Sequence, residues 1–136
     1  MIERVALRAR LADPRRNEVE RVEEHEVEAV KAAAGELGFA AVELDVTGAD
    51  KPAVLDRFAD ALQFPAWFGR NWDALYDCLV DLSWLAAPGY AVILRGFADL
   101  RARLPADAEV VREILDEAVA QHAKHGVAMT VFLVAA

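Results

Sequence analysis

Residues 62–85 are the most informative stretch of the chain and read LQFPAWFGRNWDALYDCLVDLSWL. An aromatic turn that contains a proline runs directly into a segment whose apolar residues recur at helical spacing. At 100° per residue, Asp73, Asp77 and Asp81 fall on one face of that helix, and its large apolar side chains fall almost opposite. The pattern predicts a helix over residues 71–83 that buries one side and exposes a row of carboxylates on the other.

The three aspartates repel one another, because like charges four residues apart destabilise an isolated helix by roughly 0.2–0.5 kcal/mol per pair. Of the nearby residues, only Arg70 could neutralise this face. A basic binding partner could neutralise it instead. An acidic helical face is usually no more than a solvated surface, so the row of aspartates by itself leaves both interpretations open.

The composition is that of a single folded domain. The chain has 136 residues, of which 56% are hydrophobic and 28% are charged, and this length can bury a core without disulfides or metals. The net charge is −8, and residues 39–83 carry 8 acidic against 3 basic side chains. An acidic surface repels phosphate groups, so we expect neither direct nucleic-acid binding nor binding to an anionic membrane. The natural partner is a basic protein.

The cellular compartment is predicted from what the sequence lacks. Cys78 is the single cysteine, which excludes an intrachain disulfide and suits a reducing interior. The N-terminus has no uninterrupted apolar stretch, and the longest apolar run, around residues 127–136, is too short to span a bilayer. We therefore expect a cytoplasmic protein. A homodimer that joined two aspartate faces would repel itself, so we expect a monomer when the protein is free.

Compact apolar runs alternate with amphipathic segments along most of the chain. The runs predict strands over 39–46, 90–95 and 128–134, and the amphipathic segments predict helices over 52–63, 71–83, 97–104 and 107–125. Asn71 is placed to cap the aspartate helix, and Gly126 is placed for a left-handed end of the last helix. This order predicts an α/β fold with a three-stranded parallel sheet covered by helices.

The first 38 residues give a less regular pattern. Residues 26–37 are expected to form a helix. Residues 5–7 and 18–22 alternate as strands do, so a short hairpin that turns at Asp13 and Pro14 is one interpretation. We expect residues 1–38 to form an N-terminal extension packed on a main domain of residues 39–136.

Residues 64–79, which read FPAWFGRNWDALYDCL, closely resemble the signature of the barstar family, the bacterial intracellular inhibitors of secreted ribonucleases. The family pattern is a proline, two aromatic residues one position further on, a glycine, an asparagine, and then a run of Asp-Ala-Leu-aromatic-Asp-Cys-Leu. Every fixed element is matched. The resemblance extends more loosely from Phe39 to Val134, because the order of the predicted elements is that of the barstar fold.

The resemblance implies a non-catalytic inhibitor that needs no cofactor and no metal. In the family, the helix after the loop enters the active-site cleft of a basic ribonuclease, where an aspartate takes the place of a substrate phosphate. By position that aspartate is Asp77, and Asp73 is its partner one turn earlier. Trp67, Gly69 and Asn71 would form the loop that closes the cleft. Taken without the resemblance, Trp67 is equally well interpreted as core or as interface.

The chain also departs from the family. Gln121 and His125 stand where the namesake presents acidic residues near the end of its last long helix, so two carboxylate contacts are expected to be missing. The segment Val80-Asp81-Leu82 follows the signature at a place where the namesake is less acidic, so Asp81 is expected to compensate for the missing contacts. We expect Asp81 and Val80 to belong to a shifted binding surface, and the partner to differ from the namesake's own ribonuclease.

Two alternatives compete with an inhibitor. Asp73 and Asp77 could chelate a divalent cation in a small metal-dependent enzyme, although no further ligand cluster accompanies them. The acidic face could instead be a protein-interaction module for a partner that is not a nuclease. A cysteine nucleophile, Cys78 with His122 or His125, is not supported by any oxyanion site in the sequence.

Overall fold

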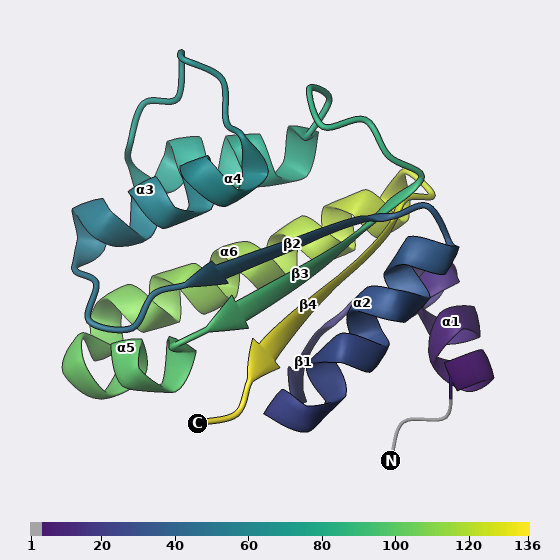
Figure 1. Ribbon diagram of the computed structural model, residues 1–136. Helices are drawn as coiled ribbons and strands as arrows, with labels where there is room; N and C mark the ends of the chain where they lie inside the picture. Colours follow the sequence, from purple (N-terminus) through teal and green to yellow (C-terminus); the bar gives the residue numbers. More distant parts are fainter. Residues whose placement is uncertain (1–3) are drawn as a thin grey trace.

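The computed structural model describes residues 4–136, and in it a parallel sheet lies between two layers of helices (Figure 1). The elements in chain order are α1 (Arg4–Ala12), η1 (Pro14–Arg16), β1 (Val19–Val22), η2 (Glu24–Glu26), α2 (Val27–Glu36), β2 (Ala40–Asp45), α3 (Lys51–Leu62), α4 (Trp72–Asp81), β3 (Gly89–Arg95), α5 (Phe97–Arg103), α6 (Pro105–Lys124) and β4 (Ala128–Val134), where η marks a single 3₁₀ turn. None of the helices in this part of the chain is both long enough and apolar enough to cross a membrane.

The sheet has the strand order β1-β4-β3-β2, and every neighbouring pair is parallel. The central strands β3 and β4 are buried along nearly their whole length, as their continuous apolar sequences require for a sheet covered on both faces. The predicted parallel pairing of β2, β3 and β4 is confirmed. The predicted number of three strands is wrong, because the sheet has four.

The fourth strand comes from the N-terminal segment, and the hairpin interpretation of that segment is wrong. Strand β1 pairs in parallel with β4, with Val19 opposite Val131 and Val22 opposite Val134. The other half of the supposed hairpin is the helix α1, in which Leu7 and Leu11 are both buried. These two leucines stand four residues apart, so helical spacing prevails over an alternation that is only three residues long.

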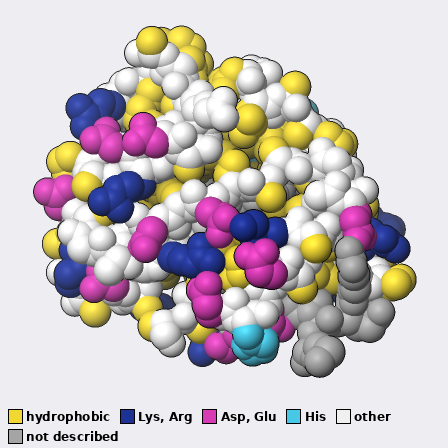
Figure 2. All heavy atoms as spheres, in the orientation of Figure 1, with side chains coloured by type: hydrophobic (Ala, Val, Ile, Leu, Met, Phe, Trp, Pro, Cys, Tyr) yellow, Lys and Arg dark blue, Asp and Glu magenta, His cyan; other side chains and the backbone are white. Residues whose placement is uncertain are grey.

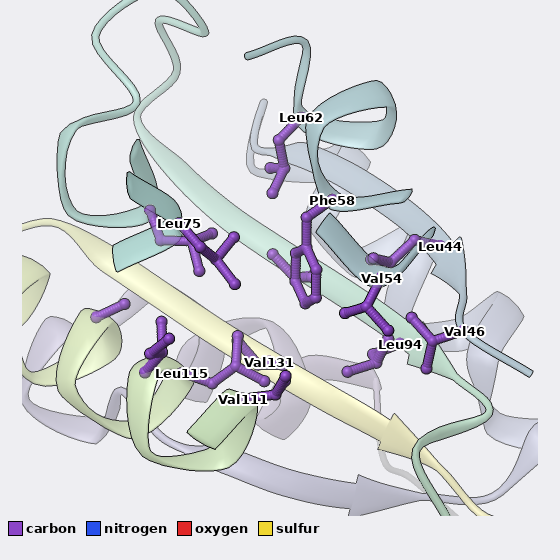
Figure 3. Packing of buried hydrophobic residues seen from close by; sticks show 14 of the residues in the cluster. Leu44, Val46, Val54, Phe58, Leu62, Leu75, Leu94, Val111, Leu115 and Val131 are labelled. Carbon is purple, nitrogen blue, oxygen red and sulfur yellow. The ribbon is translucent and has the colours of Figure 1, made fainter. Parts of the chain in front are cut away.

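One face of the sheet carries the larger core and is covered by α3, α4, α5 and α6. Figure 3 shows side chains from three of these helices converging on the sheet: Phe58 of α3, Leu75 of α4 and Leu115 of α6 meet above Val131 of β4, and all four are fully buried. Fully burying one large apolar side chain contributes roughly 1.5–3 kcal/mol. Helix α4 is therefore fixed to the sheet by its buried side.

The opposite face is covered by the N-terminal helices α1 and α2, which lie together on that side of the sheet (Figure 1). Leu7 of α1 and Val30 of α2 pack in one cluster with Ile93 of β3 and Phe132 of β4. The described part of the N-terminal segment thus supplies both an edge strand and the cover of one sheet face. Residues 1–3 of the predicted extension lie outside the described residues.

The predicted helix ends are confirmed where they were specific. The Asn71 side chain accepts a hydrogen bond from the Ala74 backbone at 2.8 Å and caps α4. Asp50 was not predicted as a cap, yet its side chain caps α3 by accepting from the Ala53 backbone at 3.1 Å. Gly126 has φ of 71° and ends α6 in the left-handed conformation that glycine adopts at little cost.

Candidate functional site

Helix α4 is held rigidly along one side, which fixes what its other side presents. Leu75, Cys78 and Leu79 are completely buried against the core. The helix ends at Leu82, whose φ of 51° is left-handed although the residue is not glycine. The carbonyl of Leu82 accepts from the Leu85 backbone at 3.0 Å and that of Leu79 lies 2.8 Å from His122 Nε2, so the C-terminal end of α4 is held by the following turn and by α6.

The opposite side of α4 is the row of aspartates. Asp73, Asp77 and Asp81 are all exposed, and no ion pair joins any of them to another side chain that the structure describes, those of residues 5–136. The sequence left Arg70 as a possible neutralising cation, but Arg70 pairs with Asp56 of α3 at 2.8 Å. The described side chains therefore supply no cation to this row. We call Asp73, Asp77 and Asp81 together the acidic row.

The loop before α4 is packed down by some of its aromatic residues and exposes another. Phe64 meets Phe68 edge to face at 4.9 Å and Trp84 at 5.9 Å, and the Trp84 indole donates to the Leu62 carbonyl at 3.0 Å. Trp67 also packs edge to face with Trp84, with 5.9 Å between the ring centres, yet its side chain remains 63% exposed. Large exposed aromatic side chains are frequent anchors of protein interfaces, so the structure favours the surface interpretation of Trp67 over the core one.

Gly69 and Asn71 differ in what the fold demands of them. A methyl group at Gly69 would meet its neighbours at ordinary distances, the closest being Asn71 Nδ2 at 3.5 Å, so the fold has room for alanine there. Asn71 is engaged as the cap of α4, and its Nδ2 donates to the Gly69 carbonyl at 3.4 Å. Asn71 therefore already has a structural task, whereas the fold gives no reason for glycine at position 69.

A groove of about 310 Å³ runs between α4 and α6, beside the acidic row. Its lining residues are Trp72, Asp73, Tyr76, Asp77, Val110, Ile114 and Glu117. Glu117 was not among the site residues predicted from the sequence; it is exposed and brings a carboxylate from α6 to the groove that the two aspartates of α4 also line. A signal was present, because Glu117 continues the helical stripe of Val110 and Ile114 toward Gln121.

The residues at the far end of the acidic row lie around a second, smaller hollow of about 280 Å³. Val80 and Asp81 line it together with His125 and Val127. Gln121 is not among its lining residues, and its carbonyl is 3.0 Å from His125 Nδ1. The structure therefore brings His125 to the end of the acidic row, where the resemblance had placed an acid.

Neither a thiol nucleophile nor a metal centre is assembled at this site. Burial, and then the charges of Asp77 and Asp81, raise the pKa of the Cys78 thiol, which disfavours the reactive thiolate. His122 is buried and directs its Nε2 to the Leu79 carbonyl. Within residues 4–136, no group of three or more His, Cys, Asp or Glu side chains is arranged to hold a metal ion. The alternative of a metal-dependent enzyme therefore lacks a donor set in the described chain.

Comparison with known proteins agrees with this geometry. The chain is 38% identical over 63 residues to a protein of Bacillus subtilis (strain 168) named "Putative ribonuclease inhibitor YrdF". That match covers 46% of this chain and 66% of the relative, just under two thirds of the relative's length. The family described as Barstar (barnase inhibitor) matches residues 39–134, which is well over half of the chain and includes the loop, α4 and α6. The chain belongs to the barstar family.

Proposed function

We propose that the protein inhibits a basic ribonuclease, or a related toxin nuclease, by placing the acidic row and the preceding aromatic loop over the enzyme's active site. The observation that carries the proposal is the unpaired state of Asp73, Asp77 and Asp81 on a rigid helix next to the exposed Trp67. A family of barnase inhibitors and a relative named for ribonuclease inhibition support it.

The chemistry of the acidic row suits an enzyme that binds phosphate. Carboxylates accept bidentate hydrogen bonds from arginine, and a carboxylate held on a fixed helix loses little conformational entropy on binding. Asp77 is the middle member of the row, so it would reach deepest among the cations of the enzyme. Asp73 would be the next contributor, and Asp81 would lie nearer the rim beside Val80.

The groove between α4 and α6 extends this surface. Its floor offers Trp72 and Tyr76 to the aliphatic part of a lysine or arginine side chain, and its acidic side chains can meet the charged end. We propose that Glu117 takes part in binding, in place of the acids that Gln121 and His125 do not supply. The footprint would then lie closer to the middle of α6 than in the namesake.

The proposed inhibitor is non-catalytic, works without a cofactor, and acts as a monomer in the cytoplasm of the cell that makes the ribonuclease. Trp67, Gly69 and Asn71 would close the rim of the enzyme's cleft. Because a methyl group at Gly69 meets no close neighbour within the chain, its glycine is better explained by the close approach of a partner.

The experiment has two steps. The tagged protein is first used to recover its partner from the native cells, and the recovered protein is assayed for RNA cleavage with and without the inhibitor. Association and dissociation rates are then measured for Asp73→Ala, Asp77→Ala and Glu117→Ala. Glu28→Ala is the matched control, because Glu28 is an exposed acid on α2, on the other side of the sheet.

We expect Asp77→Ala to lose about 2–5 kcal/mol of binding free energy, mainly through faster dissociation, because the enzyme's cations are left buried without a partner. Asp73→Ala and Glu117→Ala should lose less, and Glu28→Ala should bind as the wild type does. Recovery of a partner without nuclease activity would favour an interaction module instead. RNA cleavage by the purified protein alone would overturn the non-catalytic role.

A further inference from the structure

We infer that the hollow at the carboxyl ends of β1 and β4 binds a small organic anion, a phosphate or carboxylate group attached to an apolar body. The hollow has a volume of about 400 Å³. Its lining residues include three arginines, Arg21, Arg101 and Arg112, and three large apolar residues, Val19, Phe97 and Leu133. None of these residues lines the α4–α6 groove, so the inference does not rest on the proposed inhibitor function.

The hollow lies on the face of the sheet that α5 and α6 cover: Val19 and Leu133 pack on that face, and Phe97, Arg101 and Arg112 come from the two helices. After β1 the chain turns to α2 on one face of the sheet, and after β3 it turns to α5 on the opposite face, with the end of β4 between them (Figure 1). The hollow lies at this end of the sheet, and residues of α5, but none of α2, are among those that line it. Open α/β sheets characteristically bind their ligands beyond the carboxyl ends of their strands.

Three arginines give the hollow a positive lining in a chain whose net charge is −8. Arg101 makes no ion pair with any described residue, and its guanidinium lies 6.0 Å from the centre of the Phe97 ring. Arg112 directs only its Nε to Asp116, at 3.2 Å. Arg21 is 3.4 Å from Glu23 and its side chain remains 74% exposed. Each guanidinium therefore keeps donors for an external acceptor.

The other residues that line the hollow are apolar, so they favour a ligand whose anionic group is attached to an apolar body. Val19, Phe97 and Leu133 supply apolar surface, and the volume falls in the range of about 300–1,000 Å³ that is usual for small-molecule sites. A nucleic acid would bring many further phosphates toward an acidic protein surface, which the charge disfavours. An apolar anion of modest size satisfies both the arginines and the apolar walls, because guanidinium groups recognise phosphate and carboxylate in a bidentate manner.

The test is to titrate small anions into the full chain at low salt and to measure binding from the changes in the backbone amide chemical shifts. The probes are phenyl phosphate, benzoate and inorganic phosphate. A purification tag is kept off the C-terminus because Ala135 and Ala136 line the hollow. We expect phenyl phosphate or benzoate to shift the amide resonances at the ends of β1 and β4 and in α5. The probe that binds with the higher affinity identifies the preferred anionic group. Inorganic phosphate should bind about tenfold more weakly, because it cannot use the apolar walls.

Variants decide whether the arginines carry the binding. Arg101→Met and Arg112→Met each remove one guanidinium and keep the apolar stem, and each should weaken binding by about tenfold. Arg15→Gln is the control, because Arg15 lies on η1 and its side chain is 89% exposed. The inference is overturned if neither organic probe binds below about 10 mM, or if the double variant Arg101→Met/Arg112→Met binds as the wild type does.

Discussion

Two regions of this protein differ in whether their acidic side chains form ion pairs. On the side of α2 and the strand ends, Arg95 holds Glu43 at 2.7 Å and Glu24 at 2.8 Å, and Lys31 holds Glu43 at 3.0 Å. We call these four residues the paired network. Acidic and basic side chains are interleaved over this part of the surface in Figure 2. In the acidic row of α4, by contrast, the described chain supplies no cation to any carboxylate.

The contrast separates the charges that stabilise the fold from those that do not. Arg95 and then Lys31 hold the pKa of Glu43 below its usual range, and Arg95 does the same to the pKa of Glu24. The ionised forms of both glutamates are thus favoured by folding. The members of the acidic row gain no such partner and repel one another. Natural selection for stability alone would not place them there, which is consistent with a role in binding.

The largest effect on stability is expected at the N-terminal link between the two helix layers. The Asn17 side chain accepts from the Met129 backbone at 2.9 Å and donates to the carbonyls of Val127 at 2.9 Å and Val119 at 3.0 Å. Asn17→Ala leaves all three backbone groups without this partner, so it should cost about 2–4 kcal/mol of unfolding free energy in urea denaturation. The molecules of the variant that remain folded should bind the partner with unchanged affinity. A loss below about 0.5 kcal/mol would show that water replaces the side chain.

The paired network should have a smaller effect on stability, and that effect should depend on pH. Arg95→Met removes the cation shared by two glutamates and should cost about 1 kcal/mol at neutral pH. The folded-state pKa values of Glu24 and Glu43 are lowered, so their contribution is present above the unfolded value of about 4.5 and is lost as pH falls through the folded values. Unfolding curves of wild type and variant should therefore converge in acid. Curves that stay equally far apart at low pH would contradict the linkage.

Gly69 should have the smallest effect on stability, because a methyl group there meets its neighbours at 3.5 Å or more. Gly69→Ala should change the unfolding free energy by no more than about 0.5 kcal/mol. If the loop meets the partner as we propose, the added methyl group should still weaken binding, by about 1 kcal/mol. Calorimetric titration of the folded variant with the partner measures this. Unchanged affinity would remove Gly69 from the binding surface and leave the helix as the site.

The elements that the sequence predicted are the helices α2 to α6 and the strands β2 to β4, and the longest and most strongly periodic patterns among them are those of α3, α4 and α6. Strand β1 is only four residues long, and its pairing with Val131 to Val134 joins segments more than 100 residues apart, which no local pattern reveals. Helix α1 was missed because its buried face shows only Leu7 and Leu11 among polar and small residues.

The candidate site divides in the same way. The acidic row was predictable because its three members share one helix and one period. The pairing of Arg70 with Asp56 and the position of Glu117 were not, because each depends on how α4 packs against another helix. Sequence reasoning therefore found the side chains within an element and missed the contacts between elements.

The most direct test of the contrast between the two regions compares Asp77→Asn in the acidic row with Glu43→Gln in the paired network. Both substitutions remove one negative charge at nearly constant shape. For each variant, the dissociation constant with the recovered ribonuclease and the free energy of unfolding are measured under the same conditions.

We predict that Asp77→Asn weakens binding by about 2–5 kcal/mol and leaves the fold unchanged or more stable by up to about 0.5 kcal/mol, because repulsion along α4 is relieved. Glu43→Gln should lower stability and leave the affinity unchanged. If Asp77→Asn instead binds the ribonuclease as tightly as the wild type does, the acidic row is not the binding surface, and the proposed inhibitory mode is wrong.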